Sequence, residues 1–408
     1  MRVLFGSYHN IFDLGSGAAI SARALLSELA SQGAEATSVS GAFFDGAITT
    51  SDAFLSELRR RRIQYEVKNG IMRRAGNHEG SEFQVVHHAD AGIDSFAFLP
   101  QDAFGSSSRR YEISSASNKA FHRTLYDKIE QFAPDLFLSY GGYRAAINGP
   151  RIARRFGATS VFYLCNHSYG RKELFSEYDA YIVPSDFTRN YYRDRLGIEA
   201  TVLPPIIDEA SFLTESNTRE FVTMINPSRE KGLFFLGIAK ELQSARPDIP
   251  LLIVESRSSA ASILKIFGAS ALGNLRIMKA TPRPREIYAR TRITLVPSVC
   301  HEMFGRVAVE SALNGIPVLT SGRGALSEVI PSEFNLPIPE RFTPFIDAMP
   351  TSAEVAPWLD AIIQLWDNDA LALNAGATLQ ESAQRYRQEQ VVERSFNTCE
   401  ALVKKRKK

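Results

Sequence analysis

The chain has 408 residues, of which 44% are apolar and 23% charged, and its formal net charge is +2. At about 100–200 residues per domain this length predicts two or three domains, and the composition excludes a disordered or collagen-like chain. So small a net charge gives no overall field for binding nucleic acid, and we expect no nucleic-acid partner.

The cysteines and the hydropathy pattern bear on the cellular compartment in which we expect the protein. Cys165, Cys300 and Cys399 lie far apart, which excludes a disulfide framework and a cysteine zinc site and fits a reducing environment. No run reaches the roughly 18–20 apolar residues of a membrane span, and the first residues are typical of a buried strand rather than a signal peptide. We expect a cytoplasmic protein, and the basic runs 59–62 and 404–408 suggest peripheral contact with the inner membrane face as an alternative.

The first half of the chain alternates buried strands and amphipathic helices. A strand at 2–8, a glycine loop, a helix at 18–33 and a strand at 36–41 form one right-handed parallel unit. Similar strands are expected within 135–142, 158–167 and 180–183, each followed by polar residues or a helix. Residues 62–118 are less regular, and Asn69-Gly70 predicts a hairpin turn between extra strands.

A proline-rich, polar stretch at 203–220 is typical of a linker, and a second alternating block follows it. Its expected strands lie within 221–227, 249–256, 274–280, 293–298 and 316–322, with helices at 232–245 and up to residue 314. Two such blocks predict an α/β protein of two doubly wound, Rossmann-like domains facing a central cleft. We expect domains at 1–203 and 204–389, with the C-terminal helix near 390–408 as a candidate to pack back on the first domain.

Glu302 and Glu310 are the leading candidates for a binding site. Glu302 follows a strand in what we expect to be an exposed loop, and Glu310 lies on the next helix, which begins after Gly305. Eight residues span about 12 Å in a helix, which suits two carboxylates holding opposite ends of a nucleoside diphosphate sugar. Glu310 would accept hydrogen bonds from the ribose diol and Glu302 would hold sugar hydroxyls. The spacing alone favours the alternative, in which one glutamate is a helix cap and the other lies on a solvated face.

The surrounding pattern resembles the retaining glycosyltransferases of the GT-B fold, family 4 type. Their signature places Pro-Ser before Glu-x-Phe-Gly, with a second Glu after seven intervening residues. The matching residues here are Pro297, Ser298, Glu302, Phe304, Gly305, Glu310, Ala312, Gly315, Pro317 and Val318. The resemblance covers most of the second domain and is much weaker over the first. It implies a donor-binding second domain and an acceptor-binding first domain, with Phe304 and Gly305 orienting the sugar.

The resemblance also implies cationic residues beside the diphosphate. Lys231 matches the lysine of the family, whereas Asn226 or Pro227 stands where its arginine usually lies. Arg229, which is shifted from that position, and Arg306, next to Gly305, are the candidates to supply the missing charge. An exposed surface arginine is the alternative interpretation of both.

Two further residues are assigned by the same resemblance. Gly17 lies in the glycine loop that contacts the donor diphosphate in the family, although a plain tight turn explains it as well. His167 ends a strand where such enzymes place a histidine that touches the donor sugar. The nicotinamide alternative is weak, because Ile20 stands at the third position of GxGxxG. Gly305 also stands where a zinc-protease HExxH would need its second histidine.

The resemblance therefore implies a retaining glycosyltransferase that moves a sugar from a UDP- or GDP-sugar to an acceptor hydroxyl, and we expect it to need no metal because fixed cations would neutralise the diphosphate. Glu302, His167 and Lys231 are its expected catalytic residues. No cofactor is expected beyond the donor, and the acceptor is a glycan, a lipid-linked, peptide or small molecule, expected near residues 8–14, 69–118 and 141–144. The alternatives are a phosphorylase or nucleotide-sugar epimerase on the same scaffold and a non-catalytic nucleotide-sugar-binding protein.

Overall fold

The computed structural model of the chain describes residues 1–45, 48–73, 80–101, 104, 115–142, 144–256, 258–267, 272–343, 345 and 348–406. Backbone contacts divide the chain into two compact units. The N-terminal unit comprises Met1–Pro184, Arg189–Ile206 and Val391–Lys408, and the C-terminal unit comprises Ser185–Thr188 and Ile207–Gln390. The last two residues of the basic run 404–408, and much of the expected acceptor region between 69 and 118, lie outside the described residues.

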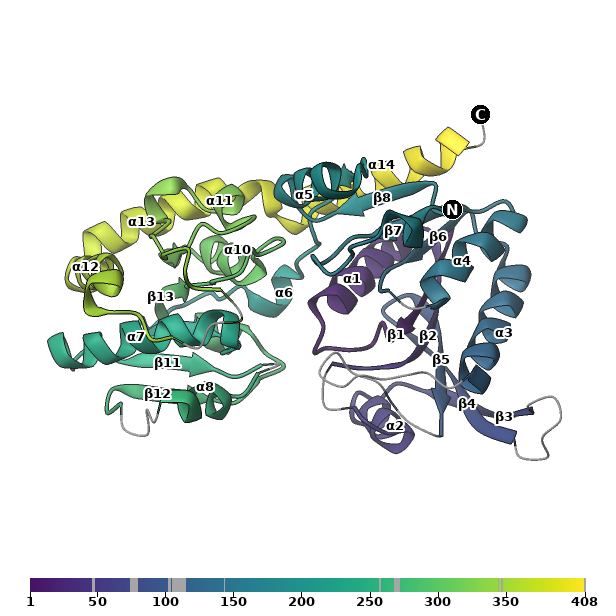
Figure 1. Cartoon of the computed structure of the whole chain (residues 1–408), viewed down its shortest axis with the longest axis horizontal. Helices are drawn as coiled ribbons and strands as arrows, with labels where there is room; N and C mark the ends of the chain where they lie inside the picture. The colour runs from purple at the N-terminus through teal and green to yellow at the C-terminus, as the bar shows by residue number, and fades with distance from the viewer. Residues whose placement is uncertain are drawn as a thin grey trace. The chain divides into compact units, whose positions relative to one another are not determined.

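Within the described residues, the N-terminal unit is built on a nine-stranded sheet in the order β3-β4-β5-β2-β1-β6-β7-β8-β9 (Figure 1). All neighbouring pairs are parallel except β3 with β4 and β4 with β5. The strands are β1 (Arg2–His9), β2 (Glu35–Phe43), β3 (Tyr65–Arg73), β4 (Gly80–Asp90), β5 (Ile93–Pro100), β6 (Leu136–Ser139), β7 (Thr159–Tyr163), β8 (Ala180–Val183) and β9 (Thr201–Val202).

Most helices of this unit lie between successive strands, as the alternating sequence predicts, and the C-terminal helix is the exception. The helices are α1 (Gly17–Ser31), α2 (Ser51–Arg60), α3 (Ser115–Phe132), α4 (Arg144–Arg155), the 3₁₀ turn η1 (Lys172–Phe175), most of α5 (Asp186–Leu196) and most of α14 (Gln388–Arg406). The apolar face of α14 joins the core of this unit, because Val391, Val392, Cys399 and Val403 are buried in the same cluster as α1 residues such as Leu25. The final helix is thus part of the N-terminal unit's core.

The prediction of a turn at Asn69-Gly70 is wrong. Both residues lie inside β3, paired with Gln84 and Phe83 of β4. A Cβ atom on Gly70 would lie 2.7 Å from Phe83 Cε2, so the glycine makes room for the phenylalanine ring of the facing strand. Glycine in a strand marks close approach as often as a turn, and the sequence pattern does not distinguish the two.

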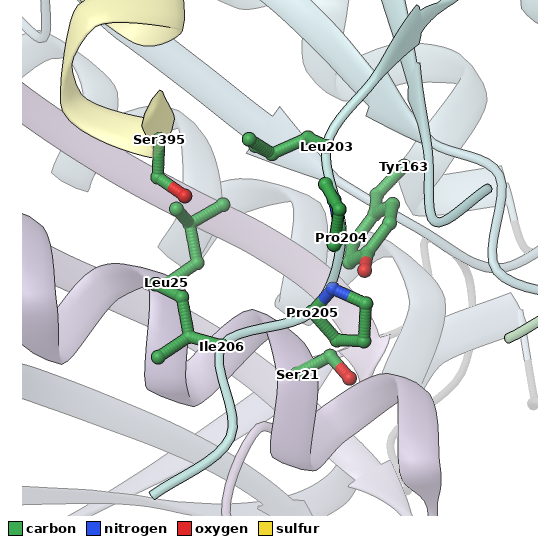
Figure 2. Close-up of a pocket in the computed structure, with 8 residues that line it drawn as sticks. All are labelled: Ser21, Leu25, Tyr163, Leu203, Pro204, Pro205, Ile206 and Ser395. Carbon is green, nitrogen blue, oxygen red and sulfur yellow. The ribbon is translucent and has the colours of Figure 1, made fainter. Parts of the chain in front are cut away.

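The chain leaves the N-terminal unit through Leu203, Pro204, Pro205 and Ile206, which line a small cavity together with Ser21, Leu25, Tyr163 and Ser395 (Figure 2). Its volume of about 10 Å³ is room for about one water molecule. This cavity therefore belongs to the packing of the linker and holds no site for a sugar nucleotide.

Within the described residues, the C-terminal unit is built on a five-stranded parallel sheet in the order β12-β11-β10-β13-β14. Its strands are β10 (Phe221–Ile225), β11 (Leu251–Val254), β12 (Leu275–Met278), β13 (Thr291–Val296) and β14 (Val318–Thr320). Its helices are α6 (Glu209–Phe212), α7 (Arg229–Ala245), α8 (Ala260–Phe267), α9 (Arg285–Tyr288), α10 (Arg306–Leu313), α11 (Leu326–Val329), α12 (Ser352–Asp367) and α13 (Asp369–Ala383), with the 3₁₀ turns η2 (Ser332–Phe334) and η3 (Gln384–Tyr386).

The helix expected at 232–245 begins earlier, at Arg229, which places Lys231 in the first turn of α7. The apolar face of α7 packs on the sheet and on α12, where Trp358 is fully buried. The Trp358 indole N–H donates to the Pro337 carbonyl at 3.1 Å, so this large side chain is buried with its polar group satisfied. This core holds the start of α7 in place relative to the sheet.

Candidate functional site

The strand order of the C-terminal unit indicates where a ligand would bind. Chain connections run from β10 outward through β11 to β12, then return to β13 on the other side of β10 and continue to β14. The neighbours β10 and β13 therefore form the topological switch point, where open α/β sheets bind ligands at the carboxyl ends of the strands. Two helices begin at this point, α7 after β10 and α10 after β13.

Lys231 and Glu302 meet at this switch point. Lys231 lies in the first turn of α7, and its Nζ is 2.8 Å from Glu302 Oε1. Ser298, two residues after the end of β13, donates its hydroxyl to the same oxygen at 2.6 Å. The side chains of Lys231 and Glu302 are 15% and 19% exposed. The structure thus brings together two of the residues that the sequence singles out, as one partly buried ion pair.

The ion pair keeps Lys231 charged. Burial by itself lowers the pKa of Lys231, but the adjacent Glu302 carboxylate outweighs it, so that the pKa is raised above its usual value. The pKa of the nearby Cys300 thiol is also raised, to about 12, by burial first and then by the charge of Glu302. Cys300 therefore stays a thiol at neutral pH and is no nucleophile.

The prediction of an exposed loop is correct for the loop but wrong for the exposure, because Glu302 lies outside the named helices and strands while its side chain is only 19% exposed. Glu302 forms a parallel bridge with Gly324, its N–H donates to the Arg323 carbonyl at 3.3 Å, and its carbonyl accepts from Ala325 N–H at 2.8 Å. Gly324 has φ +67, and a Cβ there would lie 2.7 Å from Glu302 N. The backbone of residues 323–325 thus sets the position of Glu302.

Arg323 fixes the same loop through its side chain, which the sequence alone did not reveal. Its guanidinium donates to the carbonyl oxygens of Val299 and Phe342, and to those of Ile338 and Pro339 at 3.0 and 2.9 Å. Arg323 therefore ties the loop before Glu302 to residues 338–342. The residue after Glu302 is also held, because the Met303 carbonyl accepts hydrogen bonds from the hydroxyls of Ser185 and Thr188 at 2.7 and 3.2 Å.

Phe304 and Gly305 have different roles in the described structure. Phe304 is 6% exposed and packs edge-to-face on Tyr386, so its side chain belongs to the core. Gly305 is the N-cap of α10 with φ +93, and a Cβ there would lie 2.7 Å from Leu326 Cδ2. Glycine has no side chain to cap the helix, and no side-chain cap of α10 is found among the described residues.

Glu310, on α10, receives hydrogen bonds from two directions. The Tyr288 hydroxyl donates to Glu310 Oε2 at 2.7 Å, and Arg306 Nε and Nη2 lie 3.4 Å from Oε1. The Glu310 side chain is 13% exposed. The expected partner of Arg306 is the diphosphate, whereas the structure pairs it with Glu310, four residues along the helix. Arg229, the first residue of α7, is exposed.

Gly17 and His167 belong to the N-terminal unit. Gly17 is the first residue of α1, it is exposed, and a Cβ there would meet no atom within 4 Å. No contact within the described structure therefore requires a glycine at this position. His167 follows β7 and packs edge-to-face on Tyr191 at 4.7 Å between ring centroids.

The N-terminal unit has its own switch point, between β1 and β6. A close pair of side chains, His9 and Asp13, lies there and was not predicted from the sequence. His9 Nε2 lies 2.9 Å from Asp13 Oδ2, and Asp13 also accepts the N–H groups of Gly15 at 2.8 Å and Asp45 at 2.6 Å. Burial alone raises the pKa of Asp13, but these hydrogen bonds lower it below its usual value. Asp13 thus holds the glycine loop that precedes α1.

A metal ion could in principle be held by His9, Asp13 and Asp45. Their potential ligand atoms lie within 4.8 Å of one another, and this is the cluster of that kind found among the described residues. The hydrogen bonds to Asp13 account for the cluster as a brace for the loop. Among the described helices, none is both long and apolar enough to cross a membrane.

Comparison with known proteins finds similarity over much of the C-terminal unit. Residues 257–394 match the model of the family described as "Family 4 Glycosyltransferase in conflict systems". The chain is also 26% identical over 175 residues to lipopolysaccharide 1,2-N-acetylglucosaminetransferase of Salmonella typhimurium, a match over 36% of this chain and 45% of that protein. The match thus spans less than half of the relative.

Similar solved structures extend the comparison to the whole chain. Sucrose-phosphate synthase from Thermosynechococcus elongatus superimposes with a TM-score of 0.67 at 16% identity, over 99% of each chain. HepE of Anabaena, in complex with UDP-glucose, has a TM-score of 0.63 at 13% identity, over 98% of this chain and 100% of that one. The expected fold class, α/β with two Rossmann-like domains, is confirmed as the GT-B fold. The family-model match covers residues 257–394, about a third of the chain, and the solved structures show the shared fold.

Proposed function

We propose that this chain, as a GT-B glycosyltransferase of family 4 type, transfers a sugar from a UDP- or GDP-sugar to an acceptor hydroxyl with retention of anomeric configuration. The observation that carries the proposal is the Lys231–Glu302 pair of 2.8 Å at the switch point of the C-terminal unit. The complex of HepE with UDP-glucose, on the same fold, favours UDP as the first donor nucleotide to test.

The leaving diphosphate is the group that most needs stabilisation. Breaking the anomeric bond builds positive charge on the sugar and negative charge on the diphosphate, so fixed positive charge beside the diphosphate lowers the barrier. Lys231 supplies an ammonium whose pKa is raised above its usual value. The open N-termini of α7 and α10 add N–H donors, since neither helix has a side-chain cap in the described structure. We expect these groups, with Arg229 or Arg306, to take the place of a metal ion.

The two glutamates would hold the two ends of the donor. Glu302, with Ser298 and Lys231 on its Oε1, would accept from hydroxyls of the sugar, and the Phe304-Gly305 backbone would orient it. Glu310 would accept from the ribose diol. In the retaining mechanism that the resemblance implies, the acceptor attacks the face from which the diphosphate leaves, and a departing phosphate oxygen takes the acceptor proton.

The N-terminal unit would bind the acceptor. Its switch point carries the Asp13-braced glycine loop, and residues 8–14 were expected near the acceptor on the resemblance alone. Gly17 and His167 are the residues of this unit to which the resemblance assigns contacts with the diphosphate and the sugar. The acceptor itself is a glycan, or a lipid-linked, peptide or small molecule.

A donor screen tests the proposal. The melting temperature is measured with UDP, GDP, ADP and dTDP and with the corresponding glucose and N-acetylglucosamine donors, in the presence of a chelator. A ligand that binds the native state raises the melting temperature by mass action. We expect UDP or GDP to give a shift that Lys231→Ala reduces and Lys240→Ala, an exposed lysine on the same helix, does not. The absence of a shift with every nucleotide would contradict the proposal.

Product analysis separates the alternatives. Release of nucleoside diphosphate only when an acceptor pool is added, with the sugar found on the acceptor, is expected for a transferase. Release of the diphosphate by transfer to water, with the freed sugar epimerised, indicates a hydrolysing epimerase. Dependence on inorganic phosphate indicates a phosphorylase, and binding without turnover indicates a binding protein. Proton NMR of the anomeric linkage checks retention.

A further inference from the structure

Tyr288 reaches Glu310 from a separate helix. Tyr288 ends α9, which precedes β13, whereas Glu310 lies in α10, which follows it. The tyrosine is 1% exposed, and its hydroxyl donates to Glu310 Oε2 at 2.7 Å. The hydrogen bond from the buried Tyr288 hydroxyl to the partly exposed Glu310 carboxylate therefore connects the core of the C-terminal unit to the edge of the candidate site.

The direction of this hydroxyl is fixed by its surroundings. The ring packs edge-to-face on Phe212, and the Thr291 hydroxyl donates to the Ile287 carbonyl at 2.8 Å, which holds the end of α9. Burial first, and then the Glu310 carboxylate, raise the pKa of Tyr288 well above its usual value. The hydroxyl therefore stays protonated and acts as a donor across the whole working pH range.

The other oxygen of Glu310 is held much more loosely. Oε1 has contacts of 3.4 Å with Arg306 Nε and Nη2, which are long for a charge-assisted hydrogen bond. Arg306 Nη1 is buried with no hydrogen-bond acceptor among the described residues. A carboxylate offers about four lone-pair sites, so one hydrogen bond from Tyr288 leaves room for two hydroxyl donors.

We infer that Tyr288 is a positioning residue for nucleotide recognition, which holds Glu310 so that its carboxylate accepts both hydroxyls of a ribose rather than closing on Arg306. The inference rests on the proposed function, because it assigns a second residue to the nucleoside end of the same site. Without the Tyr288 hydroxyl, Glu310 Oε2 loses its hydrogen bond, and the carboxylate can turn toward Arg306.

The consequence is selectivity for ribose over deoxyribose. A carboxylate held to accept both hydroxyls loses one partner with a 2′-deoxy ligand, and a hydrogen bond to a charged group contributes enough for about a tenfold or greater preference. Tyr288→Phe should weaken binding of the ribonucleotide about tenfold, while 2′-deoxynucleotide binding changes little. The KM for the donor should rise by a similar factor with kcat nearly unchanged.

The experiment compares affinities by calorimetry. UDP, 2′-deoxy-UDP, GDP and 2′-deoxy-GDP are titrated into the wild type, Tyr288→Phe, Glu310→Ala and a control, Tyr178→Phe. The control also loses a buried hydroxyl, one that donates to the Ala146 carbonyl at 2.5 Å in the N-terminal unit. Melting temperatures of the two phenylalanine variants show whether each is folded, and the ratio of ribo to deoxy affinity does not depend on the folded fraction.

The results distinguish a failure of the role assigned to Tyr288 from a failure of the proposed function. Loss of the ribo preference in both Tyr288→Phe and Glu310→Ala, with the preference kept in Tyr178→Phe, supports the inference. If Glu310→Ala loses the preference but Tyr288→Phe keeps it, Tyr288 is only a packing residue and the inference is overturned. A wild type that binds none of the four nucleotides overturns the proposed function and the inference with it.

Discussion

At the scale of single residues, the candidate site is a set of charges that stabilise one another before any ligand arrives. Lys231 and Glu302 are each partly buried, and an unpaired charge at such a position costs several kcal/mol. Ser298 and the backbone of residues 323–325 add neutral hydrogen bonds to Glu302. The pair is therefore expected to couple in stability as well as in activity.

A double-mutant cycle measures that coupling. Lys231→Met and Glu302→Gln should each lower the free energy of unfolding by about 1–3 kcal/mol, and the double variant should cost clearly less than the sum. Urea unfolding followed by tryptophan fluorescence reports on this unit, because Trp358 and Trp366 both lie in it. Additive costs would show that the two side chains do not interact in solution.

The pH dependence of the coupling follows from the raised pKa of Lys231. A cation whose folded-state pKa lies above its unfolded value contributes stability that is complete below the unfolded pKa, near 10.5, and is lost as pH rises through the folded value. The coupling free energy should therefore be constant between pH 6 and pH 9. A coupling that falls by half over this range would contradict the assignment of the charge to Lys231.

His88 gives a second pH effect, in the N-terminal unit. It is 3% exposed between the rings of Phe12 and Phe54, and burial lowers its pKa to about 4. Well above pH 6.5 the side chain is neutral in both states and contributes nothing. As the pH is lowered through 6.5, the unfolded chain binds a proton that the folded chain does not, so the free energy of unfolding decreases, by about 2 kcal/mol between pH 7.5 and pH 5.

His88→Phe removes this term. Urea unfolding is followed at pH 7 and pH 5 by pulse-labelling hydrogen exchange at one fixed labelling pH, in peptides from residues 83–100. The wild type should lose about 2 kcal/mol more than His88→Phe between the two pH values. Equal losses would mean that His88 is protonated in the folded protein.

At the scale of elements, the sequence predicts strand and helix positions well but not contacts between distant segments. The signature at 297–318 identifies Glu302 and Glu310, and the alternating pattern places them after β13 and on α10. Tyr288 and Arg323 were missed because their importance depends on which segments pack together, and no local pattern encodes this. The Asn69-Gly70 dipeptide shows the same limit, since Phe83 of the facing strand decides its conformation.

The backbone pairing of residues 323–325 with Glu302 gives the element-scale prediction. Gly324→Ala introduces a Cβ at a positive φ and within 2.7 Å of Glu302 N, so the loop must shift. We expect transfer activity to fall at least about tenfold, because small displacements of catalytic groups are costly. Gly273→Ala is the matched control, since a Cβ there meets no atom within 4 Å. Full activity in Gly324→Ala would show that the bridge does not position Glu302.

At the scale of the whole molecule, the chain forms two units, each with its own core, and its C-terminal residues belong to the N-terminal unit. Residues 391–406 bury Val391, Val392, Cys399 and Val403 in the core of the N-terminal unit. Truncation after Gln390 should therefore destabilise the N-terminal unit by several kcal/mol while the C-terminal unit stays folded. Hydrogen exchange should rise in β1 and α1 peptides, and the tryptophan unfolding curve should stay unchanged. Parallel loss of both units would contradict two independent cores.

The most direct test of the donor site is a crystal structure of the chain with UDP or GDP bound. The diphosphate should lie at the start of α7 and α10 beside Lys231, with the ribose hydroxyls on Glu310 and the sugar side toward Glu302. A nucleotide bound elsewhere, with both glutamates pointing away from it, would contradict the assignment of the donor site to the switch point of β10 and β13.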